Sequence, residues 1–521
     1  MSTFHGLEMA KRALFAQQGA LYTTGHNISN VNTSGYSRQR AEFVTTKPYP
    51  VPSRVQPHIA GQLGTGVKIG TVERVRDQFL DAQYRAETSK YSYWNTMSEA
   101  LSRMEELINE PSENGLSRTM DQFWQSLQEL ATNPDNDGAR AVVAERGLAV
   151  AETFNYLSKS LQAIQGDLKD QIEKGTVEKV NSLLDQIADV NDQIQKLEPH
   201  GYLPNDLYDD RDRLIDELSE IINIKVTYSK SSNSPNELEI ADGLASIEIV
   251  DESGKSFDPP VKLIEAYDPD NQTDQEVNKL EIDFDDTGTL VSEVRVGSTT
   301  VFDDEHNDDM SILGSIGSFT ALIEANGYVD EDGNAVGVYP EMLAELDKLA
   351  KEFAEAFNAV HSSGFDMNGD EGKEFFVRKD EFDGITAESI TVASEILDDP
   401  NLIAAAVANK GSRNGENALE LTKVFDNENI DGLGTSPRKF LTALVGQLGV
   451  DAQRANRMTG NTGILRDQVD HSRRSVSAVS LDEEISNLIK FQHAYNAAAR
   501  NMTAVDELID RVINQMGLVG R

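Results

Sequence analysis

The chain has 521 residues, 39% hydrophobic and 26% charged, which is enough for about three or four domains with separate cores. No run of about 18 apolar residues is uninterrupted, which excludes an ordinary membrane-spanning helix. The absence of cysteine excludes disulfides, thiolate metal sites and cysteine nucleophiles. The first residues lack a basic segment followed by an apolar one, so we expect no ordinary cleaved signal peptide.

The formal net charge of −41 is unevenly distributed along the chain. Residues 1–90 sum to +5 and residues 441–521 to zero, so residues 91–440 carry −46. Such an acidic middle repels phosphates, so neither nucleic acid nor an anionic membrane is an expected partner. The less charged ends are suited to packing, and the acidic middle to exposure.

The N-terminal segment is predicted to be a helix from about Phe4 to Val31. An apolar residue recurs every seven positions along it, a spacing typical of a seam for another helix. These residues are Leu7, Leu14, Leu21 and Ile28. Only one position per heptad is strongly apolar, so the helix alone would be marginal in water. A turn-rich run over residues 30–36 ends it.

The C-terminal segment carries a stronger heptad pattern, in which two apolar ladders are offset by three or four residues. The first ladder is Leu481, Leu488, Tyr495, Met502, Ile509 and Met516. The second is Phe491, Ala498, Val505, Val512 and Val519. Ser480 is the expected N-cap, and three acidic residues follow it in the first turn. The pattern predicts coiled-coil-like packing, with an ordinary amphipathic helix as the alternative.

Between these ends the hydrophobic period changes several times. Residues 36–75 are turn-rich and β-like, residues 77–222 show helical spacing, and residues 224–301 alternate with period two, including Leu238–Ile240. Helical spacing returns over Pro340–His361 and from Pro437. The predicted fold class is α+β and multi-domain, with paired terminal coiled-coil-like helices, a long-helix bundle and an inserted antiparallel β domain. Residues 1–35 with 478–521 are predicted to form the axial core helices. Residues 36–222 with 310–477 are predicted to form the helical bundle with β-hairpin-rich segments, and residues 223–309 the inserted β domain.

No catalytic, cofactor or metal constellation stands out among the side chains. Asp366, Asn368 and Asp370 resemble the first half of a calcium-binding loop, but Glu371 and Val377 replace the glycine and glutamate that it requires. A turn that satisfies backbone amides explains them as well. The glycines at 61–66 lack a phosphate-binding context, and no HxxxH, HExxH or GxSxG spacing occurs. A structural role is favoured for all of these.

Two longer segments are more specific. Residues 27–40 (NISNVNTSGYSRQR) and residues 480–500 (SLDEEISNLIKFQHAYNAAAR) closely resemble the N- and C-terminal signatures of the bacterial flagellar axial proteins. Residues 64–85 and 357–376 narrow the resemblance to hook-associated proteins, which form the junction between hook and filament. The resemblance covers about 1–110 and 340–521 well and the central helices loosely, whereas the β segment matches no quotable motif.

The resemblance implies a non-enzymatic structural subunit, exported through the flagellar type III channel and located outside the cell. Its expected partners are further copies in a ring-like layer, the hook protein, a second hook-associated junction protein and an export chaperone at the C-terminal helix. The two heptad ladders would then be packing seams. The turn that leaves the core would be shaped by Asn27, Asn30, Asn32, Gly35 and Tyr36.

Other interpretations remain open at this point. The chain could be another axial protein, such as a hook, rod or second junction protein, although helix-rich residues 77–222 disfavour a hook protein. The β segment could be an adhesin-like or enzymatic insert, but the sequence has no metal or nucleophile signature to support catalysis. A calcium-dependent module at Asp366, Asn368 and Asp370 is the third possibility.

Overall fold

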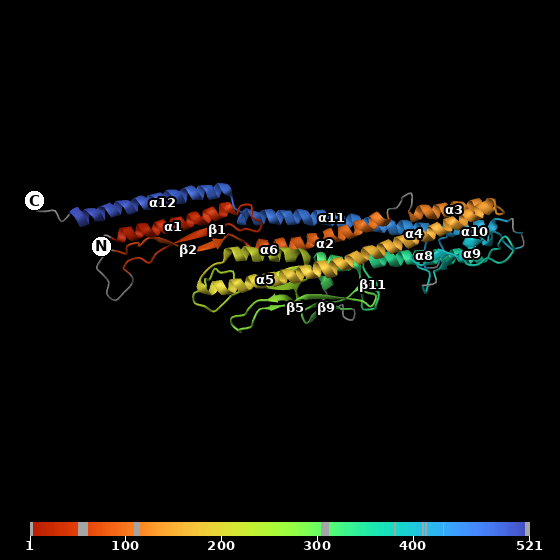
Figure 1. Cartoon of the computed structure of the whole chain (residues 1–521), viewed down its shortest axis with the longest axis horizontal. Coiled ribbons are helices and arrows are strands. Elements are labelled where there is room, and N and C mark those ends of the chain that lie inside the picture. Colours follow the sequence, from red (N-terminus) through yellow and green to blue (C-terminus); the bar gives the residue numbers. More distant parts are fainter. Residues whose placement is uncertain are drawn as a thin grey trace, which may run out of the picture.

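The computed structural model describes residues 4–50, 61–108, 115–303, 312–379, 382–408, 411, 414–430 and 432–515. The molecule is elongated, and its helices run along the long axis with both termini at one end (Figure 1). The first helix, α1 (Phe4–Ser29), and the last, α12 (Leu481–Asp510), lie side by side at that end. We call these two helices and the adjoining β-hairpin the axial core, and the remainder the body.

The body is built mainly from helices. Long helices lie at the predicted places and are α2 (Gln78–Ile108), α3 (Leu116–Thr132), α4 (Asp137–Asp170), α5 (Glu178–Leu197), α6 (Asn205–Ile221), α8 (Val338–Ser362) and α11 (Pro437–Ser477). Three shorter helices that the pattern did not predict are α7 (Ser318–Asn326), α9 (Ser394–Asp398) and α10 (Glu416–Val424). Short π or 3₁₀ segments are η1 (Gln171–Val177), η2 (Glu198–His200), η3 (Ile312–Gly314), η4 (Pro400–Leu402) and η5 (Arg511–Gln515). Within the described residues, no helix is both long and apolar enough to cross a membrane.

A two-stranded hairpin lies against α1. Its strands, β1 (Gln39–Thr45) and β2 (Val67–Arg74), pair antiparallel from Gln39 opposite Arg74 to Thr45 opposite Val67. This confirms the β-like prediction for residues 36–75 where they are described. Helix α1 is therefore packed on two sides, by α12 and by the hairpin.

Two sheets, one antiparallel and one mixed, lie beside α5. One has the order β3 (Ile224–Ser229), β4 (Leu244–Val250), β5 (Ser256–Glu265) and β6 (Glu276–Val277). The other joins β7 (Leu280–Phe284), β8 (Val291–Val296), β9 (Thr299–Asp303), β10 (Tyr328–Val329) and β11 (Ala335–Val336), with β10 parallel to β8. The second sheet thus extends past residue 309, the predicted end of the β unit.

One strand prediction is wrong, because Leu238–Ile240 lies in turns. The Glu237 carboxylate accepts hydrogen bonds from the Ser231 amide at 3.2 Å and the Ser232 hydroxyl at 2.9 Å, which ties this segment into a loop. Three alternating residues are too few to outweigh such local bonds.

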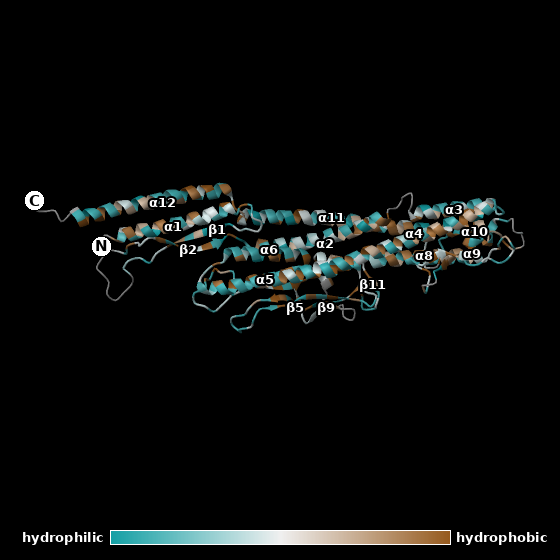
Figure 2. Cartoon of the chain, viewed as in Figure 1, coloured by the Kyte–Doolittle hydropathy of each residue, from teal (hydrophilic) through white to brown (hydrophobic). Residues whose placement is uncertain are grey.

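The hydrophobic core of the body is continuous from helices to sheets. In Figure 2, brown apolar residues alternate with teal hydrophilic ones along the long helices and occupy much of β5. Helices α2 and α11 pack against each other. Buried residues recur every seven positions along α11, at Leu441, Leu448, Ala455, Thr462 and Val469. A two-stranded sheet, β12 (Phe376–Arg378) with β13 (Ile390–Val392), packs against α8 and the middle of α4, where Asn155 Nδ2 donates to the Ile390 carbonyl at 3.1 Å.

Candidate assembly interface

The C-terminal helix presents its predicted ladders toward α1. Ala498 and Ile509 are buried, while Leu488, Phe491, Tyr495, Met502 and Val505 are half-buried. Leu481 and Val512, at the two ends of the ladders, are exposed. Met516 lies outside the described residues. Ser480 occupies the N-cap position with extended backbone, but its side chain accepts no capping hydrogen bond.

On α1, the predicted ladder lies at the edge of the packed surface. Leu7, Leu14, Leu21 and Ile28 are half-buried. The buried residues of this helix are the small or polar Ala10, Ala16, Ala20, Thr24 and Asn27. A helix held between two neighbours needs small residues where they approach closely. Gly19 is one such place, because a Cβ atom there would clash with a methyl of Ile69 on β2.

The turn after α1 is organised around the buried side chain of Asn27. Its Nδ2 donates to the Gln39 carbonyl at 2.8 Å, and its Oδ1 accepts from the Gln39 amide at 3.0 Å and the Tyr36 hydroxyl at 2.7 Å. Gly35 has a φ of 79°, the left-handed region that favours glycine. Asn30 caps the helix end by donating to the His26 carbonyl at 3.1 Å. The turn residues Asn27, Asn30, Gly35 and Tyr36 therefore cooperate, whereas Asn32 is exposed and takes no part in these bonds.

Replacing Asn27 with alanine should lower the stability of this turn by about 1–3 kcal/mol, because three part-buried hydrogen bonds to Gln39 and Tyr36 would be lost. The expected result is faster amide hydrogen exchange over residues 30–40. Asn30→Ala removes a more exposed bond and serves as the matched control. Unchanged exchange in the Asn27 variant would contradict the proposed role of this side chain.

The outward faces of the paired helices carry apolar residues that nothing in the described chain covers. Ile485 is 49% exposed and Ile489 is 48% exposed on α12, and Phe15 and Tyr22 are still more exposed on α1. Ile485 and Ile489 are one turn apart, so they form a short ridge. An apolar ridge of this kind is typical of a surface that another protein chain covers.

A cluster of charged residues, not predicted from the sequence, joins the axial core to the body. We call it the ionic cluster. Its members are Arg74, Arg76, Arg85, Arg473, Asp81, Asp209, Asp212, Asp216 and Asp242. The arginines come from β2, the segment after it, α2 and α11, and three of the aspartates from α6.

Asp212 is the centre of the ionic cluster and is buried. One of its carboxylate oxygens lies 2.9 Å from Arg74 and 3.3 Å from Arg76, and the other lies 3.4 Å from Arg85. The Tyr228 hydroxyl also donates to Asp212 at 3.1 Å. Asp212, on α6, therefore links its own helix to β2, α2 and β3.

Burial raises the pKa of Asp212, but the positive charges of Arg76, Arg74 and Arg85 outweigh this effect and hold the pKa well below its ordinary value. Asp209, one turn away, behaves in the opposite way. Burial raises its pKa even though Arg74 lies 2.7 Å from it. The two pKa shifts differ in direction because more arginines surround Asp212 than Asp209. The ionised form of Asp212 therefore depends on the arginines of the ionic cluster.

The other candidate motifs have structural explanations. The Asp366 carboxylate accepts a hydrogen bond from the Asp370 amide at 2.9 Å, and the Asp366 amide donates to the Asp370 carbonyl, so these bonds close a turn. No group of three or more potential metal ligands occurs among the residues that the structure describes. His361 is buried, and burial lowers its pKa to about 4. Its two ring nitrogens bond to the Lys373 carbonyl and the Ala404 amide, so it is a neutral core residue.

Comparisons with known proteins agree with this architecture. A model of the helical domain of flagellar hook-associated protein FlgK matches residues 101–376, and a model of the C-terminal region of the flagellar basal body rod proteins FlgEFG matches residues 475–516. The chain is 45% identical to flagellar hook-associated protein 1 of Bacillus subtilis, with both chains covered completely. It is 24% identical to the Escherichia coli protein of the same name, over 97% of this chain and 98% of that one.

A solved structure, the flagellar hook junction protein FlgK from Burkholderia pseudomallei, has a similar fold, with a TM-score of 0.58 and 13% identity. The match covers 76% of this chain and all of that one. The paired terminal helices and these similarities define an axial structural protein of the bacterial flagellum, which is extracellular and not an enzyme. The chain belongs to the family of flagellar hook-associated protein 1.

Proposed function

We propose that this protein forms a ring-like layer of identical subunits that joins the flagellar hook to the filament. The observation that carries the proposal is the unpartnered apolar ridge of Ile485 and Ile489 on a helix already paired with α1. A coiled-coil pair with a further apolar face can add neighbours without unfolding. The role is mechanical, so it needs shape and packing and no reactive group.

The half-buried residues of the two ladders would seal α1 to α12 within a subunit and complete their burial against neighbouring subunits. The predicted division supports this role. Residues 1–35 with 478–521 would form the axial unit, residues 36–222 with 310–477 the helical unit, and residues 223–309 the outer β unit. The acidic middle of the chain would face solvent, where like charges keep neighbouring bodies apart.

Three partners besides further copies belong to the proposal. The hook protein would contact one face of the layer and a second hook-associated junction protein the other. An export chaperone would cover α12 before assembly, because its exposed apolar residues would otherwise favour aggregation. Assembly with other axial components follows from the family.

The test is a variant in which Ile485 and Ile489 are both aspartate. A charge on each turn of the ridge should lower assembly into flagella at least tenfold, measured by motility and by the protein content of isolated hooks. The monomer should keep its melting temperature, because both residues face outward. Leu419→Asp is the matched control, since Leu419 is 48% exposed on α10 of the body. Equal loss of assembly in the control would contradict the proposal.

A further inference from the structure

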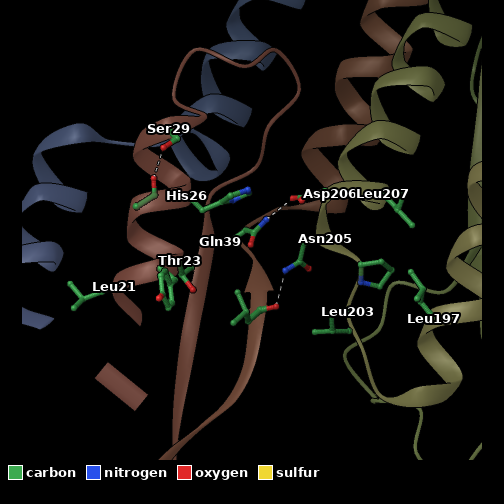
Figure 3. Close-up of a pocket in the computed structure, with 14 residues that line it drawn as sticks. Leu21, Thr23, His26, Ser29, Gln39, Leu197, Leu203, Asn205, Asp206 and Leu207 are labelled. Carbon is green, nitrogen blue, oxygen red and sulfur yellow. Dashed lines mark hydrogen bonds between the residues drawn. The ribbon is translucent and has the colours of Figure 1, made fainter. Parts of the chain in front are cut away.

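A groove of about 920 Å³ lies between the end of α1 and the body. Leu21 lies on its α1 side, and Leu197 and Leu203 lie on its body side (Figure 3). Tyr22 also lines the groove and is 70% exposed, and Leu197 is 39% exposed. The groove therefore presents apolar surface that no other part of the described chain covers.

Hydrogen bonds between the hairpin and α6 fix the wall of the groove. Gln39 Nε2 donates to the Asp206 carboxylate at 3.0 Å, and Asn205 Nδ2 donates to the Val72 carbonyl at 2.9 Å (Figure 3). These polar side chains are thus bonded within the chain, which leaves the leucines for an occupant. Because the wall is already ordered, an apolar occupant would bind without a large entropic cost.

The groove and the apolar ridge of α12 lie on opposite sides of the helix pair. Gly6 of α1 faces α12, because a Cβ atom there would stand 3.5 Å from a methyl of Val505. Tyr22 follows Gly6 by sixteen residues, which at about 3.6 residues per turn places it about 160° round the helix. Ile489 precedes Val505 by the same number of residues, so it lies about 160° round its own helix. Each surface therefore points away from the partner helix.

The groove and the ridge also lie at the same height along the paired helices. Helices α1 and α12 are antiparallel, so a step forward on one matches a step back on the other (Figure 1). From the contact between Gly6 and Val505, sixteen residues lead to Tyr22 on α1 and to Ile489 on α12. The rise per residue is the same in both helices, so Tyr22 in the groove is level with Ile489 on the ridge.

This common height selects the occupant. Copies in a ring are related by rotation about one axis, which leaves the height of every residue unchanged. With α1 and α12 along that axis, a neighbour can fill the groove only with residues at its height. The ridge, which exposed Leu481 extends by one turn, meets this condition. A second exposed apolar group begins about 30 Å farther along α12 and does not; its members are Leu508, Val512 and Ile513.

We propose that the ridge of one copy of this chain binds in the groove of its neighbour in the same layer. The contact joins two different surfaces, and rotation repeats it from copy to copy until the ring closes. The inference rests on the proposed function and deepens it, since it names the surface that covers the ridge. The contact is lateral, so both ends of the layer stay free for the hook protein and the second junction protein.

Filling the groove tests the contact. Gly25 lines the groove, and a Cβ atom there would meet nothing within 4 Å, so Gly25→Trp should leave the melting temperature of the monomer unchanged. The same variant should lower the amount of this protein in isolated hooks at least tenfold. Gly446→Trp is the matched control, because Gly446 is an exposed glycine of α11 with equally empty surroundings. Normal assembly of the Gly25 variant, or an equal loss in the control, would overturn the inference.

A disulfide can identify the occupant, because the chain has no cysteine of its own. A full-length chain with Tyr22→Cys and Ile489→Cys, oxidised in isolated hooks, should give a ladder of covalent multimers. These two residues of one chain point in opposite directions, so they cannot pair with each other. Phe15→Cys with Ile489→Cys is the matched control, since Phe15 is exposed on α1 one heptad, or about 10 Å, before Tyr22. The control pair should link at least tenfold less.

Three results of the disulfide experiment would overturn the inference. A covalent dimer without larger multimers would indicate a two-fold contact, a link to another axial protein would indicate a different occupant, and equal or absent linking in both pairs would remove the register. The outcome is separable from the proposed function. If Ile485→Asp with Ile489→Asp abolishes assembly while Gly25→Trp assembles normally, only the assignment of the groove is wrong. If the ridge variant assembles normally, the proposed function itself is wrong.

Discussion

Replacing Asp212 with alanine is expected to lower the free energy of unfolding by about 3–5 kcal/mol, because the change leaves buried arginines without their counter-charge. Arg74, Arg76 and Arg85 all lie within 3.4 Å of this carboxylate. Chemical denaturation of the full chain measures the effect. Asp210→Ala is the matched control, since Asp210 is on the same helix with its side chain 61% exposed, and should cost less than about 1 kcal/mol. Similar losses in both variants would contradict a central role for Asp212.

The effect of Asp212 should also depend on pH in a defined direction. Its pKa is depressed in the folded state, so the ionised carboxylate stabilises the fold fully above the unfolded pKa of about 3.9. As the pH falls below that value, the unfolded chain binds the proton first and the contribution is lost progressively. The stability difference between the parent protein and Asp212→Ala should therefore shrink in acid. Asp209 opposes this trend, because its raised pKa makes it a destabilising charge near neutrality, but it is present in both proteins.

The long helices could be predicted from the sequence because helix burial is periodic and local. Leu488, Tyr495 and Met502 recur every seven residues and do lie on the packed face of α12. Helix ends are local too, since Asn136 caps α4 by accepting from the Gly138 amide at 2.8 Å. A sequence pattern confined to a few helical turns predicts the structure correctly unless a tertiary contact outweighs the local preference.

The ionic cluster could not be predicted, because its members come from residues 74 to 473 and meet only in the fold. A partial signal existed on α6. Asp209, Asp212, Asp216 and Ser219 are spaced by three, four and three residues, so they share one helix face, on which all but the half-buried Asp216 are buried. Charges at such positions require partners from elsewhere, and the sequence does not say which. The buried face of α1 could not be predicted either, because the hairpin that covers it comes from a later segment of the chain.

Replacing Phe357 with alanine should also cost about 3–5 kcal/mol, because it empties the centre of an aromatic cluster at the end of the body. The ring of Phe357 lies 5.3 Å from Phe123, 5.1 Å from Phe375 and 5.3 Å from Phe376, between centroids. Each such pair adds about 0.5–1.5 kcal/mol beyond burial. The neighbouring residues have little room to move into the cavity that the substitution leaves, because packing here is tight: a Cβ atom on Gly147 would stand 2.6 Å from the Phe375 ring.

The location of the loss distinguishes this prediction from that for Asp212. Phe357 lies in α8, at the end of the body away from the axial core, so its removal should speed hydrogen exchange in α3, α8 and α10. Exchange in α1 and α12 should remain unchanged, because the ionic cluster and the hairpin still hold the core. Phe79→Ala, at a side chain that is 75% exposed, is the control and should cost less than about 1 kcal/mol. Faster exchange in α12 of the Phe357 variant would mean that core and body unfold together, and the ionic cluster would then be part of one cooperative unit rather than a joint between two.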